Sequence, residues 1–179
     1  VTAIQKNYLV TGELNITELD VALLHRHLGG SYFALGNYEL AHKSFIAALK
    51  IYEPLGNLKG VSASYNNLSL IHWAQKDFQS ALEYSVKALK ISEQLGDNQH
   101  IILKLSNQGI YYSNLQRYDD AIASYKKAIS NPESALFPKE TLIAMRALAQ
   151  RYLKSKDIAS AKKIIHEALK LSKETNNNL

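Results

Sequence analysis

The stretch YELAHKSFIAAL, residues 38–49, has three counterparts along the chain, each displaced by a further 40 residues. They read FQSALEYSVKAL (78–89), YDDAIASYKKAI (118–129) and IASAKKIIHEAL (158–169). One alanine stands fourth and another stands eleventh in every copy. Because self-similarity at one fixed period is the signature of a repeat protein, we expect an array of equivalent units rather than one irregular domain.

Within each unit the apolar and small residues follow helical spacing. In the second unit, Tyr65, Leu68, Ser69 and His72 fall at i, i+3, i+4 and i+7, which is one face of a helix. A short break follows, and the stretch that begins at Phe78 is amphipathic again. Each unit is therefore predicted to be a helix–turn–helix. The predicted units are residues 17–60, 61–100, 101–140 and 141–179, preceded over 1–16 by an N-terminal helix or part of another repeat.

Local signals mark where these helices begin and end. The run TELD, residues 17–20, is a capping box that opens the first full unit. Gly56 and Gly96 are expected to cap the second helices of units 1 and 2. In unit 3, Pro132 should stop the second helix and leave NPESALFPK, residues 131–139, as a loop.

A helical pair of this size cannot bury its apolar faces alone, whereas stacked copies can. The predicted fold is therefore all-α, a right-handed α-solenoid of about four helix–turn–helix units with one continuous core. No additional polar helix follows the second helix of unit 4, so we expect the C-terminal end of the array to be uncovered. The chain begins at Val1 rather than Met, so we expect it to be part of a longer protein.

The order Leu28, Gly29, Tyr32, followed by Ala41, Phe45 and Ala48, resembles the tetratricopeptide repeat (TPR). The period alone also suits HEAT repeats, but the small residues favour the TPR. The 40-residue length resembles a longer-helix subclass found in kinesin light chains, cell-polarity adaptors, bacterial peptide-sensing regulators, and sensory regions of histidine kinases and diguanylate cyclases. The run YEPLGNLKGVSASYNNLS, residues 52–69, is most similar to the bacterial signalling proteins. Unit 2 departs from the pattern at Ser69 and His72, and unit 4 is the loosest copy.

Composition excludes several classes of protein. The chain is 46% hydrophobic and 21% charged, which is typical of globular proteins. It has no cysteine, so disulfides, thiolate metal sites and a cysteine nucleophile are excluded. No apolar run is long enough for a membrane span, and no signal peptide is recognisable. We expect a cytoplasmic location, or a periplasmic one if the chain belongs to a membrane-anchored sensor.

Enzyme and nucleic-acid signals are weak. The net charge is +5, and the whole excess lies in residues 141–179, which is more typical of a solvated helix face than of a nucleic-acid site. The six histidines show no metal-ligand spacing, and His72 is expected to be a packed core residue. No Gly-rich phosphate loop, HExxH or GxSxG motif occurs. The sequence therefore predicts no catalytic residue, metal or cofactor.

A second stripe of the first helices carries the candidate binding residues. In unit 2, Asn66, Leu70 and Trp73 lie off the core stripe with Asn67 beside them, and the resemblance implies that this stripe faces a concave groove. The predicted partner-binding residues in all units are Arg26, Phe33, Asn66, Asn67, Leu70, Trp73, Asn107, Ile110, Asn114, Arg146 and Gln150.

Asn67 and Asn107 occupy the same position of consecutive units. A side-chain amide has donors and an acceptor, so stacked asparagines can hold the main chain of a peptide, as the resemblance to kinesin light chains and polarity adaptors also implies. Alternatively, these amides satisfy a carbonyl of a neighbouring helix. Trp73 could form an aromatic pocket with Phe33, or else lie in the core.

Two cationic positions complete the set of expectations: Arg26 and Arg146 are suited to pair with an acidic group. The Lys and Arg pattern of the carboxylate clamp in chaperone-binding TPRs is not reproduced. The sequence predicts a non-catalytic module that binds an extended or helical segment, as the sensory or scaffold region of a larger bacterial signalling protein such as a diguanylate cyclase, histidine kinase or transcriptional regulator. The alternative is an oligomerisation scaffold that associates through the uncovered C-terminal end.

Overall fold

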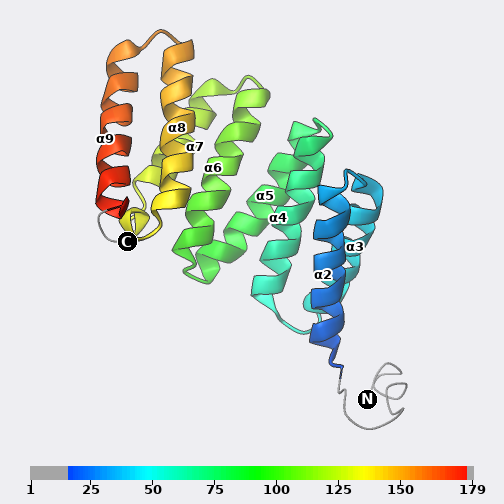
Figure 1. Ribbon diagram of the computed structural model, residues 1–179. Coiled ribbons are helices and arrows are strands. Elements are labelled where there is room, and N and C mark those ends of the chain that lie inside the picture. Colours follow the sequence, from blue (N-terminus) through cyan, green and yellow to red (C-terminus); the bar gives the residue numbers. More distant parts are fainter. Residues whose placement is uncertain (1–15, 177–179) are drawn as a thin grey trace.

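The structure is a computed structural model that describes residues 16–176 (Figure 1). These residues form helices and connecting turns, with no strand among them. The helices are α2 (Glu18–Ala34), α3 (Tyr38–Tyr52), α4 (Leu58–Ala74), α5 (Phe78–Gln94), α6 (Asn98–Asn114), α7 (Tyr118–Ile129), α8 (Pro138–Lys154) and α9 (Ile158–Asn176), with a 3₁₀ helix, η1 (Ser134–Leu136), before α8. The helix or partial repeat expected over 1–16 lies, apart from Ile16, outside the described residues.

The helices are stacked in chain order. Each packs on the next, from the α2–α3 pair through to the α8–α9 pair, and α6 also contacts α8. Figure 1 shows α2, α4, α6 and α8 succeeding one another along the array. The predicted all-α solenoid of helical pairs is confirmed.

The repeated alanines lie inside the array. Ala41, Ala81, Ala121 and Ala161 are all fully buried. A larger side chain at these positions would force neighbouring atoms to move, because protein interiors are close-packed. The spacing of 40 residues therefore follows from a packing requirement that recurs once per unit.

A small residue in the first helix also faces a ring of the second helix. A Cβ atom added to Gly29 would lie 2.6 Å from Phe45, and one added to Gly109 would lie 2.3 Å from Tyr125. Unit 2 has Ser69 at this position, and its second helix has no ring opposite it. The Ser69 hydroxyl lies instead 3.2 Å from the hydroxyl of buried Tyr111, which links units 2 and 3.

The core stripe predicted in unit 2 is also observed. Leu68 and Ser69 are fully buried. His72 is a packed histidine, as expected, because its ring stacks on Tyr84 with 5.3 Å between centroids. Its Nδ1 atom lies 3.1 Å from Oδ2 of Asp77, the residue that caps α5.

The helix ends follow local sequence, with one correction. Thr17 and Asp20 form the predicted capping box. Gly96 directly follows the C-cap of α5 at φ 64°, as predicted. Helix α3 ends earlier than expected, at Tyr52, because the proline at 54 has no amide hydrogen to continue it. Gly56 is therefore a turn residue at φ 63° rather than a helix cap.

Unit 3 is interrupted as the sequence predicts, but its loop is partly ordered. Helix α7 ends at Ile129, before Pro132. The following segment is not a plain loop, because Ser134–Leu136 form the 3₁₀ helix η1. The Thr141 hydroxyl donates a hydrogen bond of 2.8 Å to the carbonyl of Ser134, which ties η1 to the first turn of α8.

The turn between the two helices of each unit contains one residue in the left-handed backbone conformation. Gly36 has a φ of 75°, and the equivalent residues Lys76, Gln116 and Lys156 have φ values of 63°, 60° and 62°. Side chains other than glycine rarely adopt this conformation, because their Cβ approaches the following carbonyl. Three of the four turns are therefore strained.

Candidate partner-binding site

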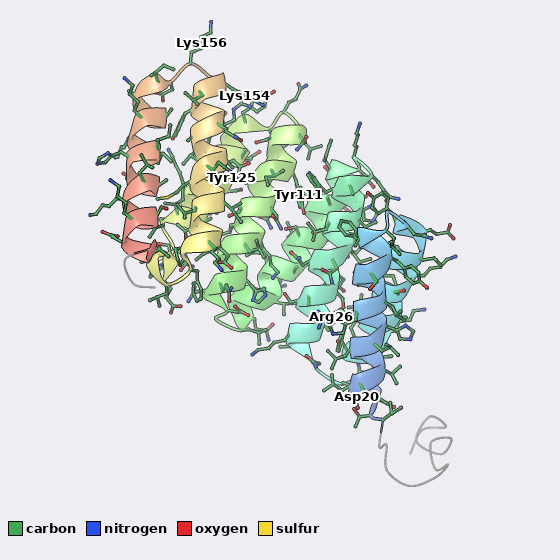
Figure 2. The ribbon with its side chains drawn as sticks, in the orientation of Figure 1. Asp20, Arg26, Tyr111, Tyr125, Lys154 and Lys156 are labelled. Carbon is green, nitrogen blue, oxygen red and sulfur yellow. The ribbon has the colours of Figure 1, made fainter. Side chains whose placement is uncertain are left out.

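The first helices of units 1, 2 and 3 enclose a groove of about 520 Å³, which we call the N-terminal groove. Helix α2 contributes Arg26, α4 contributes Asn66 and Asn67, and α6 contributes Leu103 and Lys104. Figure 2 shows Arg26 on the side of α2 that faces α4. Three predicted site residues, Arg26, Asn66 and Asn67, are thus brought together.

The asparagines of this groove have unused hydrogen-bonding capacity. The Oδ1 atom of Asn66 is buried and accepts no hydrogen bond. Asn67 is half-buried, and no side-chain hydrogen bond to it occurs within residues 16–176. The alternative that Asn67 satisfies a carbonyl of a neighbouring helix is therefore not supported, and the Asn67 amide remains available to a ligand.

Lys104 is the most unusual side chain of the groove. Only 1% of it is exposed, yet among the described residues its ammonium makes no hydrogen bond and no ion pair. Burial lowers the pKa of Lys104 to about 8, and the attraction of the Asp97 carboxylate opposes this shift. A buried ammonium without a direct partner is costly, so its presence beside a groove needs an explanation.

The other charges of the N-terminal groove are mostly positive. Arg26 and Lys59 line it, together with one carboxylate, Asp97. That carboxylate is already engaged, because it accepts a hydrogen bond from the main-chain N–H of His100 and lies 2.9 Å from the Nδ1 atom of the same residue. Burial raises the pKa of Asp97, but hydrogen bonds from His100 and attraction to Lys104 lower it on balance.

A second groove, which we call the C-terminal groove, lies between α6, α7 and α8 and measures about 450 Å³. It brings together four predicted site residues: Ile110, Asn114, Arg146 and Gln150. The Nδ2 atom of Asn114 donates a hydrogen bond of 2.8 Å to the carbonyl of Ile110, so this amide is partly used within its own helix.

Four predicted residues, Phe33, Leu70, Trp73 and Asn107, line neither of these two grooves. Phe33 packs on Tyr38, with 5.7 Å between ring centroids, and against the N-terminal core. Trp73 is 41% exposed, so it is not a core residue. The structure describes no ring contact between Phe33 and Trp73, and their role as a shared aromatic pocket stays a prediction, as does the two-rung ladder of Asn67 and Asn107.

Family models of the tetratricopeptide repeat match residues 20–94 and 105–133, which together make up more than half of the chain. The chain belongs to the tetratricopeptide repeat family. Among curated proteins, no relative matches the sequence.

Solved structures with the same TPR-like arrangement share little sequence with the chain. BtubC (BKLC) from P. vanneervenii is 22% identical, with a TM-score of 0.76 over 92% of this chain and 68% of its own. Aspartyl phosphate phosphatase F from Bacillus subtilis is 18% identical, with a TM-score of 0.83 over 90% of this chain and 42% of its own. The apo form of RapI is 17% identical, with a TM-score of 0.79 over 91% and 60%. The chain thus spans less than two thirds of the last two proteins, and these likenesses show the fold alone.

Sequence reasoning missed Lys104, although the TPR register carries a signal for it. Residue 104 is equivalent to Ser64 in unit 2 and to Ala144 in unit 4, and both of these are fully buried. Unit 1 has Leu24 there, which is exposed, but a lysine at a position that holds small buried residues in units 2 and 4 is rare in a protein interior. The repeat alignment alone could therefore have predicted a lysine at a buried position.

Two features that the described residues lack bear on the kind of site present. Residues 16–176 contain no group of three or more histidine, aspartate or glutamate side chains placed to hold a metal ion. None of the helices in this range combines the length and apolar character that crossing a membrane requires.

Proposed function

We propose that this TPR protein is a non-catalytic protein-binding module that holds an extended or helical segment of a partner along the face formed by α2, α4, α6 and α8. The observation that carries the proposal is the set of unpaired polar groups in the N-terminal groove. Asn66 and Asn67 have amide groups without side-chain partners among the described residues, and a peptide main chain offers both the donors and the acceptors that they lack.

The two grooves belong to the same face of the array, because they use equivalent repeat positions. Asn66 of the N-terminal groove is equivalent to Arg146 of the C-terminal groove, and Leu103 is equivalent to Ile143. A partner segment that follows the array can therefore contact both grooves. Extended segments and helices are the two common forms in which a groove of this kind recognises protein.

The wider context that we propose is the sensory or scaffold region of a larger bacterial signalling protein, such as a diguanylate cyclase, a histidine kinase or a transcriptional regulator. Two observations support it. Proteins of similar fold occur in bacteria such as Bacillus subtilis, and some of them extend well beyond the length of this chain.

Binding can be tested with peptides selected on the wild-type protein from a random library. We expect the double variant Asn67→Ala, Asn107→Ala to bind the selected peptides about 10-fold more weakly, since each lost hydrogen bond contributes about 0.5–1.5 kcal/mol. Gln79→Ala on α5 is the matched control, because it removes an exposed amide from a second helix. Equal affinity of the double variant and the control, measured by fluorescence anisotropy with circular dichroism to verify folding, would contradict the role of the asparagines.

A second candidate function is self-association through the outer face of the last unit. Helices α8 and α9 form a groove of about 480 Å³ whose lining is largely apolar. Leu153, Ile165 and Leu169 in this groove are exposed. If a second copy of the chain covers this face, Leu169→Glu should lower the mass seen by light scattering at high concentration. Val86→Glu on α5, which replaces another exposed apolar residue, should not.

A further inference from the structure

We propose that the N-terminal groove binds an acidic side chain of the partner segment, and that Lys104 is the residue that holds its carboxylate. This inference rests on the proposed function, since it names the chemistry of the ligand at the same face. It assigns a role to a side chain that the repeat pattern does not require.

Lys104 is buried at the wall of a groove and has no direct partner of its own. Its side chain is 99% removed from solvent, and residues 16–176 offer its Nζ atom no ion pair or hydrogen bond. Asp97 is the acid that attracts the Lys104 ammonium, but its carboxylate oxygens already contact the main-chain N–H and the Nδ1 atom of His100. A carboxylate that enters the groove would supply the missing hydrogen bonds and the missing negative charge together.

The other charges of the groove also favour an anionic ligand. Arg26 and Lys59 also line the N-terminal groove, so its charge is positive after Asp97 is counted. An anionic group is therefore attracted to the groove before it reaches Lys104. Once it is bound there, little solvent screens the interaction, because the ammonium is buried.

A neighbouring amide of the groove indicates that the anion is part of a peptide. Asn67 lines the same groove as Lys104, and its side chain makes no hydrogen bond among the described residues. A free anion can satisfy Lys104 but has no N–H group for the amide oxygen of Asn67, whereas an acidic residue within a peptide has a carboxylate and a main-chain N–H. Since the partner segment continues toward the C-terminal groove, the carboxylate belongs to a side chain rather than to the end of the segment.

The experiment compares peptide selections on the wild-type protein and on two variants. The probe is a random peptide library displayed with its C-termini fused to a coat protein, so every carboxylate comes from a side chain. Lys104→Met keeps the length of the side chain and removes the charge. Lys90→Met is the matched control, because it makes the same change of net charge at an exposed position of α5.

We expect the wild-type protein and Lys90→Met to select peptides that share an aspartate or glutamate at one fixed position. Lys104→Met should select peptides without it. A synthetic peptide from the first group should lose about 10- to 100-fold in affinity when its acid is changed to the amide, or when Lys104 is changed to methionine. Because both changes break the same contact, combining them should cause little further loss.

Three results would overturn the inference. Selection of the same acidic peptides by Lys104→Met would show that another residue holds the acid, while leaving the binding function intact. Binding only of synthetic peptides with a free C-terminal carboxylate, and not of their C-terminal amides, would show that the groove recognises a chain end. If the wild-type protein selects no peptide at all, the proposed function fails with the inference.

Discussion

Replacing Lys104 by methionine should make the folded protein more stable at neutral pH. The pKa of Lys104 is about 8 in the fold, against an ordinary value of 10.5. At pH 7 the side chain is therefore charged in both states but costs about 3 kcal/mol more in the folded one. Methionine fills similar space without a charge, so Lys104→Met should gain most of that amount.

The same shift predicts how stability changes with pH. Between pH 8 and the ordinary lysine pKa the unfolded chain binds a proton that the folded protein does not, so stability rises with pH over this window. From pH 7 to pH 9.5 the cost of Lys104 should fall by about 2 kcal/mol. Above pH 10 the trend reverses, because burial raises the pKa of Tyr111 and Tyr125 and unfolding lets these tyrosines ionise.

Urea unfolding followed by circular dichroism provides the measurement, on wild-type, Lys104→Met and Lys90→Met proteins at pH 7 and pH 9.5. We expect the advantage of Lys104→Met to be large at pH 7 and to shrink by about 2 kcal/mol at pH 9.5. Lys90→Met should match the wild-type protein at both values. An advantage of Lys104→Met that is equal at the two pH values would refute the reasoning, because a packing effect does not titrate.

Three further predictions concern the scaffold, each measured as a shift of the urea or thermal midpoint. Gly29→Ala should destabilise the protein by about 1–3 kcal/mol because its Cβ would meet a buried ring, whereas Gly30→Ala in the same helix, with open space, should stabilise it by about 0.5–1 kcal/mol. Gln116→Gly should stabilise the protein by about 0.5–1 kcal/mol by relieving a left-handed residue; no gain would show that this turn is unstrained. Burial, and then repulsion from the neighbouring His72 imidazole, lower the pKa of His42. The free energy of unfolding should therefore be highest above pH 6.5 and fall toward pH 5.5, where unfolding lets His42 bind a proton. This fall should be smaller in His42→Gln.

The sequence predicted the fold because one packing constraint recurs in every unit. Ala41, Ala81 and their equivalents are buried for the same reason, and a period that holds four times leaves a single register. The one misplaced helix end shows the limit of this reasoning. The proline at residue 54 ends α3 before the position that the repeat predicts. The glycine two residues later therefore lies in a turn and does not cap a helix.

The candidate site was harder to predict because a groove depends on neighbours from other units. The helical stripe correctly grouped Asn66 and Asn67 with Arg26, which lies 40 residues before Asn66. The same stripe contains Trp73, which lines neither groove. The position of a residue on a helix determines the direction of its side chain. Whether the surface forms a groove at that point depends on the residues of the next unit, and the repeat period does not specify them.

Lys104 shows how a repeat protein can acquire a binding group at a structural position. In units 2 and 4 the equivalent residues, Ser64 and Ala144, are small and buried, so this position leaves little room for a long side chain there. Lys104 fits because it lines the N-terminal groove. A charge buried there destabilises the free protein, and this cost would be offset only when a partner brings the opposite charge, so stability and binding should respond to Lys104→Met in opposite directions.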